Sequence, residues 1–578
     1  MVKSILLSLL LLLASRQIDD PIVAENILNE YDFIVVGAGA SGAVVASRLS
    51  EIPDANVLLL EAGSTDLKYP IIDIPFAARQ GYRSEYDWNY NIVPQKRNLQ
   101  ASLGVEQWPR GKVLGGSTSL NAMIYIRGSP HDFDSWEDHG AEGWSWKNVE
   151  PYFRKIEDAV DPEMSANLGR GGPLKISPVF TDEMTRKMIE AGKEMGLDEV
   201  DYHDDKMEGI GPIVQSQYNG IRVSSSDAYL RSILPRRNNK LHVVTNAHVT
   251  KVMTDEEKQA VGIQFVKNGI PFTVKSRKEI VLSAGSIGTP QILMLSGIGP
   301  AEHLKKKGID VIRDIPGVGS NMEDHLVAWS FHGNNFNELE GVSEENVKKY
   351  IVNGTGQLSV GFGIDTAIHT RTKYWGTDVS KSTIKRPFPS IQIFFNSNPD
   401  SALPFPHDAG KNFTAMAVGL QHPKSVGTIR LKSKDPFEQP IIDPNYLSDD
   451  DDVLMLIEGL KIIEKLEMTK TLNSIDYRMI FPDLCNFTSN QTPPRPDSFY
   501  RCYIGLSTRT LYHPCCTAKM GENDNKMAVV DSRLRVRGVR GLRIADASVM
   551  PHLTSANIQA PCYMIGEKAA DMIKEDWM

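Results

Sequence analysis

The chain has 578 residues, of which 41% are hydrophobic and 23% are charged, and its formal net charge is −9. These proportions are ordinary for a globular protein, and the length is too great for one simple core, so we expect two domains of unequal kind. The negative charge and the absence of a basic run in the sequence argue against nucleic acid as a partner.

The first fifteen residues differ from the rest of the chain. Lys3 precedes an apolar stretch from Ile5 to Leu13, and two small residues, Ala14 and Ser15, follow it. A charged start, a short apolar region and small residues are typical of a secretory signal peptide, and the stretch is too short to span a bilayer. The alternative is a buried N-terminal helix. We expect residues 1–15 to be a signal peptide and the protein to be secreted, without a membrane anchor.

Potential glycosylation sites agree with a secretory route. Sequences of the form N-x-[ST] begin at Asn353, Asn412, Asn486 and Asn490. Such sequences can carry glycans only in secreted proteins, although each one alone is close to a chance match.

The five cysteines all lie in the C-terminal part of the chain, at Cys485, Cys502, Cys515, Cys516 and Cys562. Cys485 and Cys502 flank a loop rich in Pro, Ser and Asn, and we predict that they form a disulfide. An odd number leaves at least one free thiol unless two chains are linked. The adjacent Cys515 and Cys516 could not easily bond each other.

A β-strand, a glycine turn, a helix and a second strand follow one another between Tyr31 and Gly63. The apolar run from Phe33 to Val36 is typical of a strand that is buried on both faces, and Val57 to Leu60 is a second such run. Between them, Gly37, Gly39 and Gly42 form the pattern G-x-G-x-x-G where the turn opens into the helix. The pattern predicts a dinucleotide-binding unit, because glycines permit the turn and let the backbone approach a pyrophosphate at the helix N-terminus.

Glu61 ends the second strand, nineteen residues after Gly42. A carboxylate at this place accepts hydrogen bonds from ribose hydroxyls and disfavours a 2′-phosphate. The alternative is a glycine turn without a ligand. These residues leave open whether the ligand is NAD or FAD.

A second glycine-rich segment runs from Trp108 to Trp136, after a connection from Thr65 to Tyr90 that we expect to cross the surface. In this segment Gly111, Gly115 and Gly116 alternate with short polar side chains. Such a segment can press backbone amides against a ring or a phosphate, because glycines leave no bulk in the way. An ordinary glycine-rich loop is the alternative.

The middle of the chain alternates predicted helices and strands. Helical patterns cover residues 135–157, with Trp136, Trp144 and Trp146 as core residues, and residues 186–197. Strands of a hairpin-rich layer are predicted at residues 241–252 and 261–265, and a buried strand at 278–285 precedes a helix at 289–295. Because α/β patterns return after some 200 residues, we expect a discontinuous nucleotide-binding domain with insertions.

The last third combines strands with one long helix and two candidate catalytic residues. Strand-like runs, such as Ile391 to Asn396, occur between residues 331 and 436, and Asp452 to Leu466 is an amphipathic helix. His513 stands before a proline in a loop, and Asn557 stands just before a C-terminal helix. Each could serve a structural role if it stood alone.

These stretches together resemble the glucose–methanol–choline (GMC) family of FAD-dependent oxidoreductases over nearly the whole chain. The sequences of several of these stretches are most similar to those of the insect glucose-dehydrogenase-like branch, which also contains oxidases of aromatic and terpenoid alcohols. The resemblance is carried, besides the unit at Tyr31–Gly63, by PRGKVLGGSTSLNAMIYIRG from Pro109, LSAGSIGTPQILMLSGIG from Leu282, GVGSNMEDH from Gly317, and the pair YHPCCTAKMG and ADASVMP…SANIQAPCYMIGEKAAD near the C-terminus.

The resemblance implies FAD as cofactor and a particular set of site residues. It implies that His513 and Asn557 are the catalytic pair and that no metal takes part. The residues implied to hold FAD are Gly37, Gly39, Ala40, Ser41 and Gly42 at the pyrophosphate, Glu61 at the ribose, Val249 at the adenine, Val113, Gly116, Ser117, Asn121, Ala122 and Met123 along the flavin, and Asp546, Ala547 and Gln559 near its far end.

The resemblance also implies the fold class and the domains. We expect a Rossmann-like α/β FAD-binding domain of the GMC type, formed by residues 28–330 and 531–578. We expect residues 331–530 to form an α+β substrate-binding domain with an antiparallel sheet, which contributes the His513 loop at its C-terminal edge.

The implied reaction is the oxidation of a primary alcohol, which is a sugar, an aromatic alcohol or a terpenoid alcohol, with oxygen or a quinone as the acceptor. A neutral imidazole suits the removal of the hydroxyl proton while a hydride passes to flavin N5, and an amide can hold the alcohol oxygen. The alternatives are a catalytically silent flavin-binding protein of the same fold and an NAD-dependent dehydrogenase.

The chain departs from the family's motifs at two places. Many relatives read H-P-x-G-T-C-K-M-G, whereas here the loop after His513 contains Cys515-Cys516-Thr517-Ala518. Members often read S-G-N-T-N-A-P, whereas here Ala556 replaces the glycine and Gln559 replaces the second asparagine. Both departures concern the shape of the pocket and hence the choice of substrate.

Overall fold

The computed structural model describes residues 20, 22–24, 26–100, 103–204, 206–232, 240–336, 343–374, 388–397, 412–481, 485 and 493–578. The predicted signal peptide and the sequons at Asn486 and Asn490 lie outside these residues. Within these ranges, no helix combines the length and the apolar character that crossing a membrane requires.

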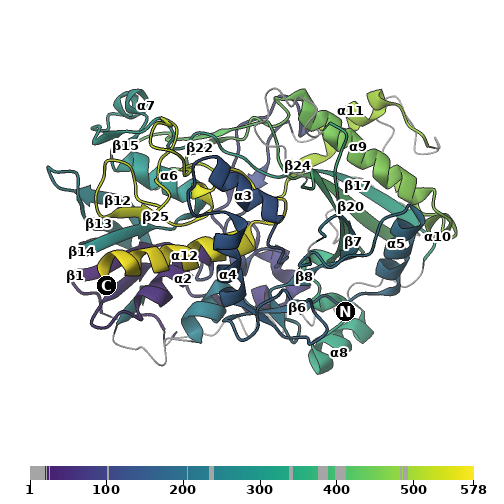
Figure 1. Ribbon diagram of the computed structural model, residues 1–578, viewed down its shortest axis with the longest axis horizontal. Helices are drawn as coiled ribbons and strands as arrows, with labels where there is room; N and C mark the ends of the chain where they lie inside the picture. Colours follow the sequence, from purple (N-terminus) through teal and green to yellow (C-terminus); the bar gives the residue numbers. More distant parts are fainter. Residues whose placement is uncertain are drawn as a thin grey trace.

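The first of two large sheets carries the predicted βαβ unit (Figure 1). Its strands lie in the order β11-β2-β1-β14-β13-β12, and β25 pairs with the end of β14. The pairs β11·β2, β2·β1, β1·β14 and β14·β25 are parallel, whereas β14·β13 and β13·β12 are antiparallel. The bounds are β1 Glu30–Val36, β2 Val57–Leu60, β11 Leu241–Val244, β12 Ala247–Thr254, β13 Ala260–Lys267, β14 Ile270–Leu282 and β25 Leu542–Ile544.

Two helices from opposite ends of the chain cover one face of this sheet. α2 (Ala40–Leu49) and α12 (Gln559–Trp577) lie side by side in Figure 1, and Gly566 of α12 comes so close to α2 that a Cβ atom there would lie 2.8 Å from the Ser41 carbonyl oxygen. Across the same interface the Arg48 guanidinium donates to both carboxylate oxygens of the buried Glu567, at 3.0 Å and 2.8 Å. The N-terminal and C-terminal parts of the chain therefore form one layer.

The carboxyl ends of the parallel strands meet at one edge of the sheet. Gly37 follows β1, Glu61 follows β2, Ser283 follows β14 and Asp546 comes two residues after β25. Ligands of open α/β sheets bind outside such carboxyl ends. This edge is therefore the place to search for a site.

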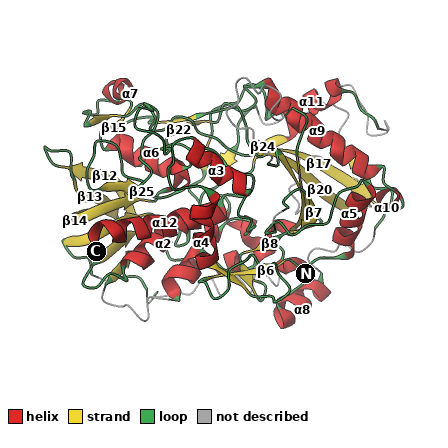
Figure 2. Ribbon diagram, viewed as in Figure 1, coloured by secondary structure: helices red, strands yellow, loops and turns green. Residues whose placement is uncertain are grey.

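The second sheet is antiparallel throughout and lies on the other side of the molecule (Figure 2). Its order is β23-β17-β20-β19-β18-β7, with β24 paired to β17, and α9 (Asp450–Glu467) packs on β17, β19 and β20. The strands are β7 Gly209–Pro212, β17 Leu326–Asn334, β18 Ile364–Thr370, β19 Ile391–Asn396, β20 Asn412–Leu420, β23 Arg478–Ile480 and β24 Thr508–Thr510.

The remaining elements are short. The helices are α3 Pro130–Asp138, α4 Trp146–Ile156, α5 Glu183–Glu194, α6 Gly285–Leu295, α7 Ala301–Lys306, α8 Glu344–Asn353, α10 Lys470–Asn473 and α11 Asp497–Ser507. The further strands are β3 Tyr90–Asn91, β4 Gln107–Trp108, β5 Glu157–Ala159, β6 Leu174–Pro178, β8 Val214–Gln215, β9 Gln217–Tyr218, β10 Ile221–Arg222, β15 Ile298–Gly299, β16 Arg313–Asp314, β21 Thr428–Arg430 and β22 Ile441–Asp443.

The predicted fold class is confirmed: a Rossmann-like α/β layer stands beside a part built on an antiparallel sheet. The domain boundaries stay a prediction. The second sheet draws β7 from within the segment 28–330 that was assigned to the nucleotide-binding domain, so insertions from that segment reach across the molecule.

Two local predictions need correction. The helical pattern over 135–157 is interrupted between α3 and α4, where Gly140 and Gly143 have φ of +87° and +80°, a backbone region that helices do not use. Trp136 and Trp144 are fully buried as predicted, whereas Trp146 is only partly buried. The connection from Thr65 to Tyr90 contains three short 3₁₀ helices (Asp66–Lys68, Pro70–Asp73 and Pro75–Gly81) and borders the central cavity instead of merely crossing the surface.

The predicted disulfide between Cys485 and Cys502 is present, with the two Cα atoms 5.7 Å apart. In this structure Cys515, Cys516 and Cys562 take no part in that disulfide. Cys515 and Cys516 are buried, and Cys562 is partly exposed.

Gly42 offers a test of the packing between α2 and β1. A Cβ atom at Gly42 would overlap the carbonyl oxygen of Gly37, so Gly42→Ala should lower the free energy of unfolding by about 1–3 kcal/mol, as other overpacked sites do. Urea unfolding of the cofactor-free protein measures this change. Gly39→Ala is the control, because its nearest neighbour, the Cα atom of Gly116, would be 4.0 Å away. Equal losses for the two variants would contradict the packing argument.

Candidate active site

A cavity of about 620 Å³ connects the carboxyl edge of the first sheet with the second sheet. At one end it is bordered by the glycine turn after β1 and by the end of β2. At the other end Trp329 and Phe331 of β17, Ile364 of β18 and Asn396 of β19 border it. Its volume lies within the roughly 300–1,000 Å³ that small-molecule and cofactor sites usually have.

The N-terminus of α2 opens into this cavity without a side-chain cap. Gly39 is the N-cap residue, and no acidic side chain occupies the first turn. Uncapped N–H groups and the positive end of the helix dipole favour an anion such as a pyrophosphate. Gly39 and Gly116 face each other so closely that a Cβ on Gly116 would come 2.8 Å from the Gly39 Cα. Two glycine segments distant in sequence thus form one cradle of bare backbone.

Glu61 lies beside this cradle, on the cavity wall. Its carboxylate accepts hydrogen bonds from the backbone N–H groups of Ala38 and Gly63, at 3.0 Å and 2.9 Å. Burial raises the pKa of this carboxyl to about 7, although both hydrogen bonds act in the opposite direction. The side chain is therefore held in place as an acceptor for a polar ligand group.

A hydrogen-bonded chain stiffens the middle of the cavity. The Asn121 amide donates to the Gln559 side chain, which in turn donates to the Ser216 hydroxyl at 2.8 Å. The backbone N–H of Met123 and the guanidinium of Arg222 both donate to Asn121 Oδ1, at 3.0 Å and 2.9 Å. The segment from Gly116 to Met123 is thereby tied to the start of α12.

Asp546 joins the cavity from the end of β25. Its carboxylate accepts from the Thr289 hydroxyl at 2.6 Å, from the Gly285 N–H at 2.9 Å and from the Ser548 N–H at 2.8 Å. Burial raises the pKa of Asp546 despite these three bonds. The carboxylate thus fixes the start of α6 to the loop before α12.

The structure brings most of the predicted site residues together. Gly42 and Val113 are the exceptions among them: Gly42 packs inside the βαβ unit, and Val113 is fully buried in a bridge with Ser64. The predicted residues that border the cavity are Gly37, Gly39, Ala40, Ser41, Glu61, Gly116, Ser117, Asn121, Ala122, Met123, Val249, His513, Asp546, Ala547, Asn557 and Gln559.

His513 and Asn557 meet at the cavity wall, with Asn557 Nδ2 3.4 Å from His513 Nε2. The backbone N–H of His513 donates to Asp324 at 2.7 Å, and Asp324 also accepts from the hydroxyls of Thr510 and Tyr446. Asn557 Oδ1 is buried and has no protein partner. A fixed imidazole and an amide with a spare acceptor therefore face the same space.

A second histidine determines which nitrogen of His513 carries the proton. His325 Nε2 lies 3.1 Å and 3.0 Å from the carbonyl oxygens of Gln421 and Thr554, so it must be the protonated nitrogen of that ring. His325 Nδ1 is then an acceptor, and it lies 2.8 Å from His513 Nδ1. His513 must donate from Nδ1, which leaves Nε2 as an acceptor that faces Asn557 Nδ2.

The electrostatic surroundings keep His513 neutral. Loss of solvent lowers its pKa well below the usual value, and the nearby His325 and Arg110 lower it further. Burial also lowers the pKa of His325, to about 3. Both imidazoles are therefore uncharged at neutral pH, as the tautomer assignment requires.

His325 and Arg110 belong to the candidate site, and sequence reasoning did not single them out. Both lie in quoted motif stretches, GVGSNMEDH and PRGKVLGG, which is the only signal that pointed to them. Arg110 borders the cavity and donates to the Tyr512 carbonyl at 2.7 Å, in the residue before His513. The contact between His325 and His513 spans 188 residues, so only the folded chain reveals it.

Aromatic side chains form the wall opposite the glycine cradle. The Tyr82 ring meets the rings of Phe362 and Tyr512 edge-on, with centroids 5.9 Å and 6.0 Å apart, and Trp329 stacks with Phe331. All five border the cavity. Phe362 has a φ of +55°, which is uncommon outside glycine, and the Asn396 amide donates to its carbonyl at 2.9 Å. This wall offers ring faces and edges, and the Arg79 guanidinium lies 4.8 Å from the centroid of the Phe362 ring.

Two models of a family described as GMC oxidoreductase match the chain, one over residues 31–327 and the other over residues 423–566. Among curated proteins, a glucose dehydrogenase (FAD, quinone) of Drosophila pseudoobscura pseudoobscura is 35% identical over 566 residues, which cover 95% of this chain and 87% of that protein. An alcohol dehydrogenase (acceptor) of Pseudomonas putida is also 35% identical, over 94% of this chain and 95% of its own. Because the fly and the bacterial protein are equally identical to this chain, these identities do not assign it to one branch of the family.

Solved structures with the same fold are flavoenzymes. A variant of formate oxidase from Aspergillus oryzae RIB40, described for its FAD modification, superposes with a TM-score of 0.86 at 28% identity and covers 95% of this chain and 99% of its own. A pyridoxine 4-oxidase superposes with a TM-score of 0.81 at 29% identity, over 94% of this chain and 99% of its own.

Gly39→Ala should separate ligand binding from folding. The added methyl group has room within the protein but projects into the cradle where the predicted FAD pyrophosphate would lie, so affinity for FAD should fall about 10-fold or more. Titration of the cofactor-free protein with FAD, followed by flavin fluorescence, measures this affinity. Unchanged affinity would place the dinucleotide elsewhere.

Proposed function

The chain belongs to the GMC oxidoreductase family and uses FAD, and from this premise we propose that it is a secreted enzyme that oxidises a primary alcohol with an apolar body. The family models, the relatives and the FAD-containing structural neighbours establish the family and the cofactor. The observation that carries the proposal is the contact of His513 Nε2 with Asn557, on a ring whose Nδ1 donates to His325.

The residues around the cavity suit FAD. The uncapped start of α2 and the Gly39–Gly116 cradle would hold the pyrophosphate, and Glu61 would accept from the adenosine ribose. Ser283 Oγ and Asn557 Oδ1 are buried polar atoms on the cavity wall without a protein partner, as expected where a polar ligand completes the site. When bound, FAD supplies the flavin N5 atom as the hydride acceptor.

The chain's own residues handle the proton and the alcohol oxygen. Asn557 Nδ2 can donate to the oxygen of the alcohol and orient it, while His513 Nε2 accepts the hydroxyl proton. Removal of that proton makes the departure of a hydride from the carbon easier. Because Asn557 carries no titratable proton, it positions the oxygen without competing with the base.

His325 is a positioning residue in this scheme. By accepting from His513 Nδ1 it keeps the lone pair at Nε2, where the alcohol arrives, and the carbonyls of Gln421 and Thr554 keep His325 itself in the matching tautomer. A ring with the opposite tautomer would present an N–H group to the alcohol and could not accept its proton.

The aromatic wall supports an aromatic or terpenoid alcohol over a sugar. A sugar places several hydroxyl groups in the pocket, and each loses its hydrogen bonds to water unless the wall replaces them. Tyr82, Trp329 and Phe362 offer ring surfaces to an apolar body, and the Asn396 amide already binds the Phe362 carbonyl. Arg79, Ser507 and Arg509 also border the cavity and could bind a polar end of the substrate. A sugar substrate is the second candidate, because a relative is a glucose dehydrogenase.

Oxygen or a quinone would take up the electrons, since the names of two relatives, a glucose dehydrogenase (FAD, quinone) and an oxygen-dependent choline dehydrogenase, give these acceptors for those proteins. The predicted signal peptide supports secretion, and so does the Cys485–Cys502 disulfide, since disulfides persist in oxidising compartments. Asn353, the first sequon, is exposed at the end of α8 and is free to carry a glycan. Recovery of a shortened, glycosylated chain from the culture medium of expressing cells would test this part.

The flavin itself distinguishes the proposal from a catalytically silent protein. The purified chain should be yellow, and its flavin should bleach when an alcohol is added without oxygen. A colourless folded preparation would contradict the cofactor, and a yellow protein that no alcohol bleaches would favour the silent alternative. An NAD-dependent dehydrogenase is excluded by the family and its cofactor.

His513→Ala should retain FAD but lose about 10²–10⁴-fold in the rate of anaerobic flavin reduction, because the variant lacks the base. Stopped-flow absorbance measures the rate, and the flavin-to-protein ratio is the control for binding. Unchanged reduction would remove His513 from the reaction.

The pH profile follows from the low pKa of His513. The base acts in its neutral form, so activity is lost only as the pH falls through a pKa that lies well below the ordinary histidine value of about 6.5. We expect kcat/KM to stay level from neutral pH to below about pH 6.5, and then to fall.

His325→Phe should lower kcat about 10-fold or more and shift the pH at which activity falls in acid. A phenyl ring at position 325 cannot accept the hydrogen bond from His513 Nδ1, so it cannot hold His513 in the tautomer that has its lone pair at Nε2. An unchanged profile in that variant would contradict the role of His325.

Phe362→Ala should change specificity more than turnover. Removal of the ring should lower kcat/KM for a cinnamyl-type or terpenoid alcohol by about 10–200-fold, the range that follows from 1–3 kcal/mol of apolar contact. A short alcohol that does not reach the wall serves as the matched control substrate and should be affected much less. Preferential reduction of the wild-type flavin by glucose would favour the sugar alternative.

A further inference from the structure

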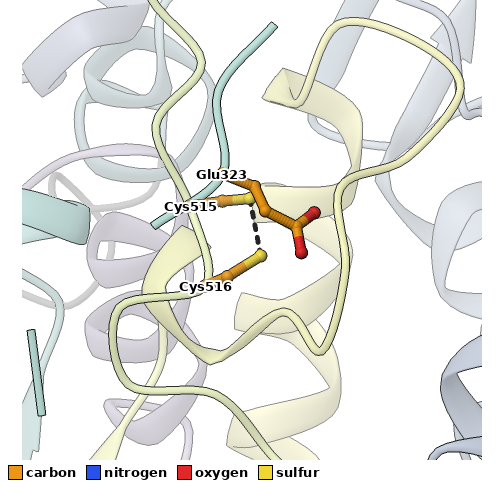
Figure 3. Close-up of side chains that lie close together, drawn as sticks. All are labelled: Glu323, Cys515 and Cys516. Carbon is orange, nitrogen blue, oxygen red and sulfur yellow. Dashed lines mark hydrogen bonds between the residues drawn. The ribbon is translucent and has the colours of Figure 1, made fainter. Parts of the chain in front are cut away.

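Two adjacent cysteines lie in the loop that carries His513. Figure 3 shows the side chains of Cys515 and Cys516 next to each other, with their sulfur atoms in contact beside Glu323. The two sulfur atoms are 2.8 Å apart, and both residues have no exposed surface. Neither residue borders the cavity, so the alcohol oxidation described above makes no use of this pair.

The backbone at Cys516 has an unusual conformation. Its φ is +67°, in the left-handed region that residues with a Cβ atom rarely adopt. In the family motif quoted above, this position after His-Pro-x is glycine, which adopts such a φ without strain. A cysteine here is strained, and an outlier of this kind calls for an interaction that a glycine could not supply.

We propose that Cys515 and Cys516 are joined by a disulfide bond in the mature protein. Neighbouring Cα atoms are about 3.8 Å apart, which is closer than in ordinary disulfides, so such a bond requires an unusual backbone between the two residues. The left-handed conformation of Cys516 provides one, and it already brings the sulfur atoms into contact. The sequence-based expectation that adjacent cysteines do not bond assumed ordinary backbone geometry.

A metal ion fits this cluster less well, although Glu323, Cys515 and Cys516 have their ligand atoms within 4.8 Å of one another. Two thiolates on one tetrahedral zinc ion lie about 3.8 Å apart, because each Zn–S bond is about 2.3 Å. The observed 2.8 Å is too short for that arrangement. Moreover, the Glu323 carboxylate already accepts from His552 Nδ1 at 3.0 Å and from the Leu553 N–H at 2.9 Å.

The bond would form by thiol–disulfide exchange during folding. Each thiol loses its proton, the two sulfurs join, and an oxidised donor disulfide of the secretory compartment takes up the two electrons and leaves as two thiols. This step rests on the proposed secretory route. In the folded protein burial raises the pKa of the Cys516 thiol to about 11 and that of the Cys515 thiol well above its usual value, so the thiols would be oxidised slowly after folding. Burial would also keep an external thiolate away from the finished bond.

The bond would position the His513 loop. The Cys515 N–H donates to the Glu323 carbonyl at 2.9 Å, and the Cys516 N–H donates to the Ala547 carbonyl at 3.2 Å. The pair therefore stands between the segment that holds His325 and the segment that leads to Asn557. A covalent ring at this point restricts the backbone two residues from the base.

Counting thiols in the full-length, FAD-loaded protein tests the proposal. The protein is denatured without reductant in the presence of iodoacetamide, digested and analysed by mass spectrometry. We expect Cys562 alone to be labelled, and all five cysteines after reduction. Labelling of both Cys515 and Cys516 without reductant would overturn the proposal, and so would a bond from either of them to Cys562 or to a second chain. Stoichiometric zinc in the native protein together with that labelling would favour the metal site. In Cys562→Ser, no cysteine should be labelled.

Two variants give a second readout. Cys516→Gly removes both the bond and the backbone strain, whereas Cys515→Ala removes the bond and keeps the strain. We expect the Tm to decrease in the order wild type, Cys516→Gly, Cys515→Ala. A higher Tm for Cys516→Gly than for wild type would show that the cysteine only strains the loop. Bleaching of the flavin by an alcohol is measured in the same preparations. If Cys515 and Cys516 are free thiols in an enzyme whose flavin an alcohol bleaches, the disulfide is refuted and the proposed reaction is not.

Discussion

The packing of α12 against α2 is the contact on which the rest of the site depends. It is close because Gly566 leaves room for α2, and it is held by the Arg48–Glu567 ion pair and by a hydrogen bond from the Ser41 hydroxyl to the Cys562 carbonyl. Glu567 is fully buried, and besides Arg48 it contacts the Lys155 ammonium at 3.0 Å and accepts from the Tyr229 hydroxyl at 2.8 Å, so that its buried charge has several partners. Since Asn557 stands two residues before α12, this contact also sets the distance between the glycine cradle and the His513–Asn557 end of the cavity.

At the His513–Asn557 end of the cavity, hydrogen bonds determine which ring nitrogen of His513 carries the proton. Backbone carbonyls can only accept, so two of them force His325 to donate from Nε2, and that in turn forces His513 to donate from Nδ1. The low pKa values of both rings remove the charged alternatives. A base with a defined tautomer thus results from fixed acceptors and burial, without a carboxylate next to the ring. Asp324 acts on the backbone of His513 instead, where it orients the loop.

Much of the fold followed from local patterns. The strand at Phe33–Val36 and the glycine turn were predictable, because burial on both faces requires a continuous apolar run and the turn requires residues without a Cβ atom. The break between α3 and α4 was missed, since the apolar spacing continues across Gly140 and Gly143 and conceals their left-handed conformation. The contribution of Thr65–Tyr90 to the cavity was also missed, because short 3₁₀ helices have no periodicity that a sequence pattern reveals.

The sequence by itself determined that a dinucleotide binds at the turn after Val36 and, through the family resemblance, that this dinucleotide is FAD. It also predicted His513 and Asn557 as the catalytic pair. The prediction of the dinucleotide site rests on residues a few positions apart, whose spacing along one strand, turn and helix fixes their geometry. Only the tertiary structure decided the tautomer of His513, the aromatic wall around Phe362 and the contact between Cys515 and Cys516. The two histidines are 188 residues apart, and the aromatic wall comes from several separate segments. The sulfur contact depends on a φ angle that no residue type dictates, so the folded backbone alone brings these groups together.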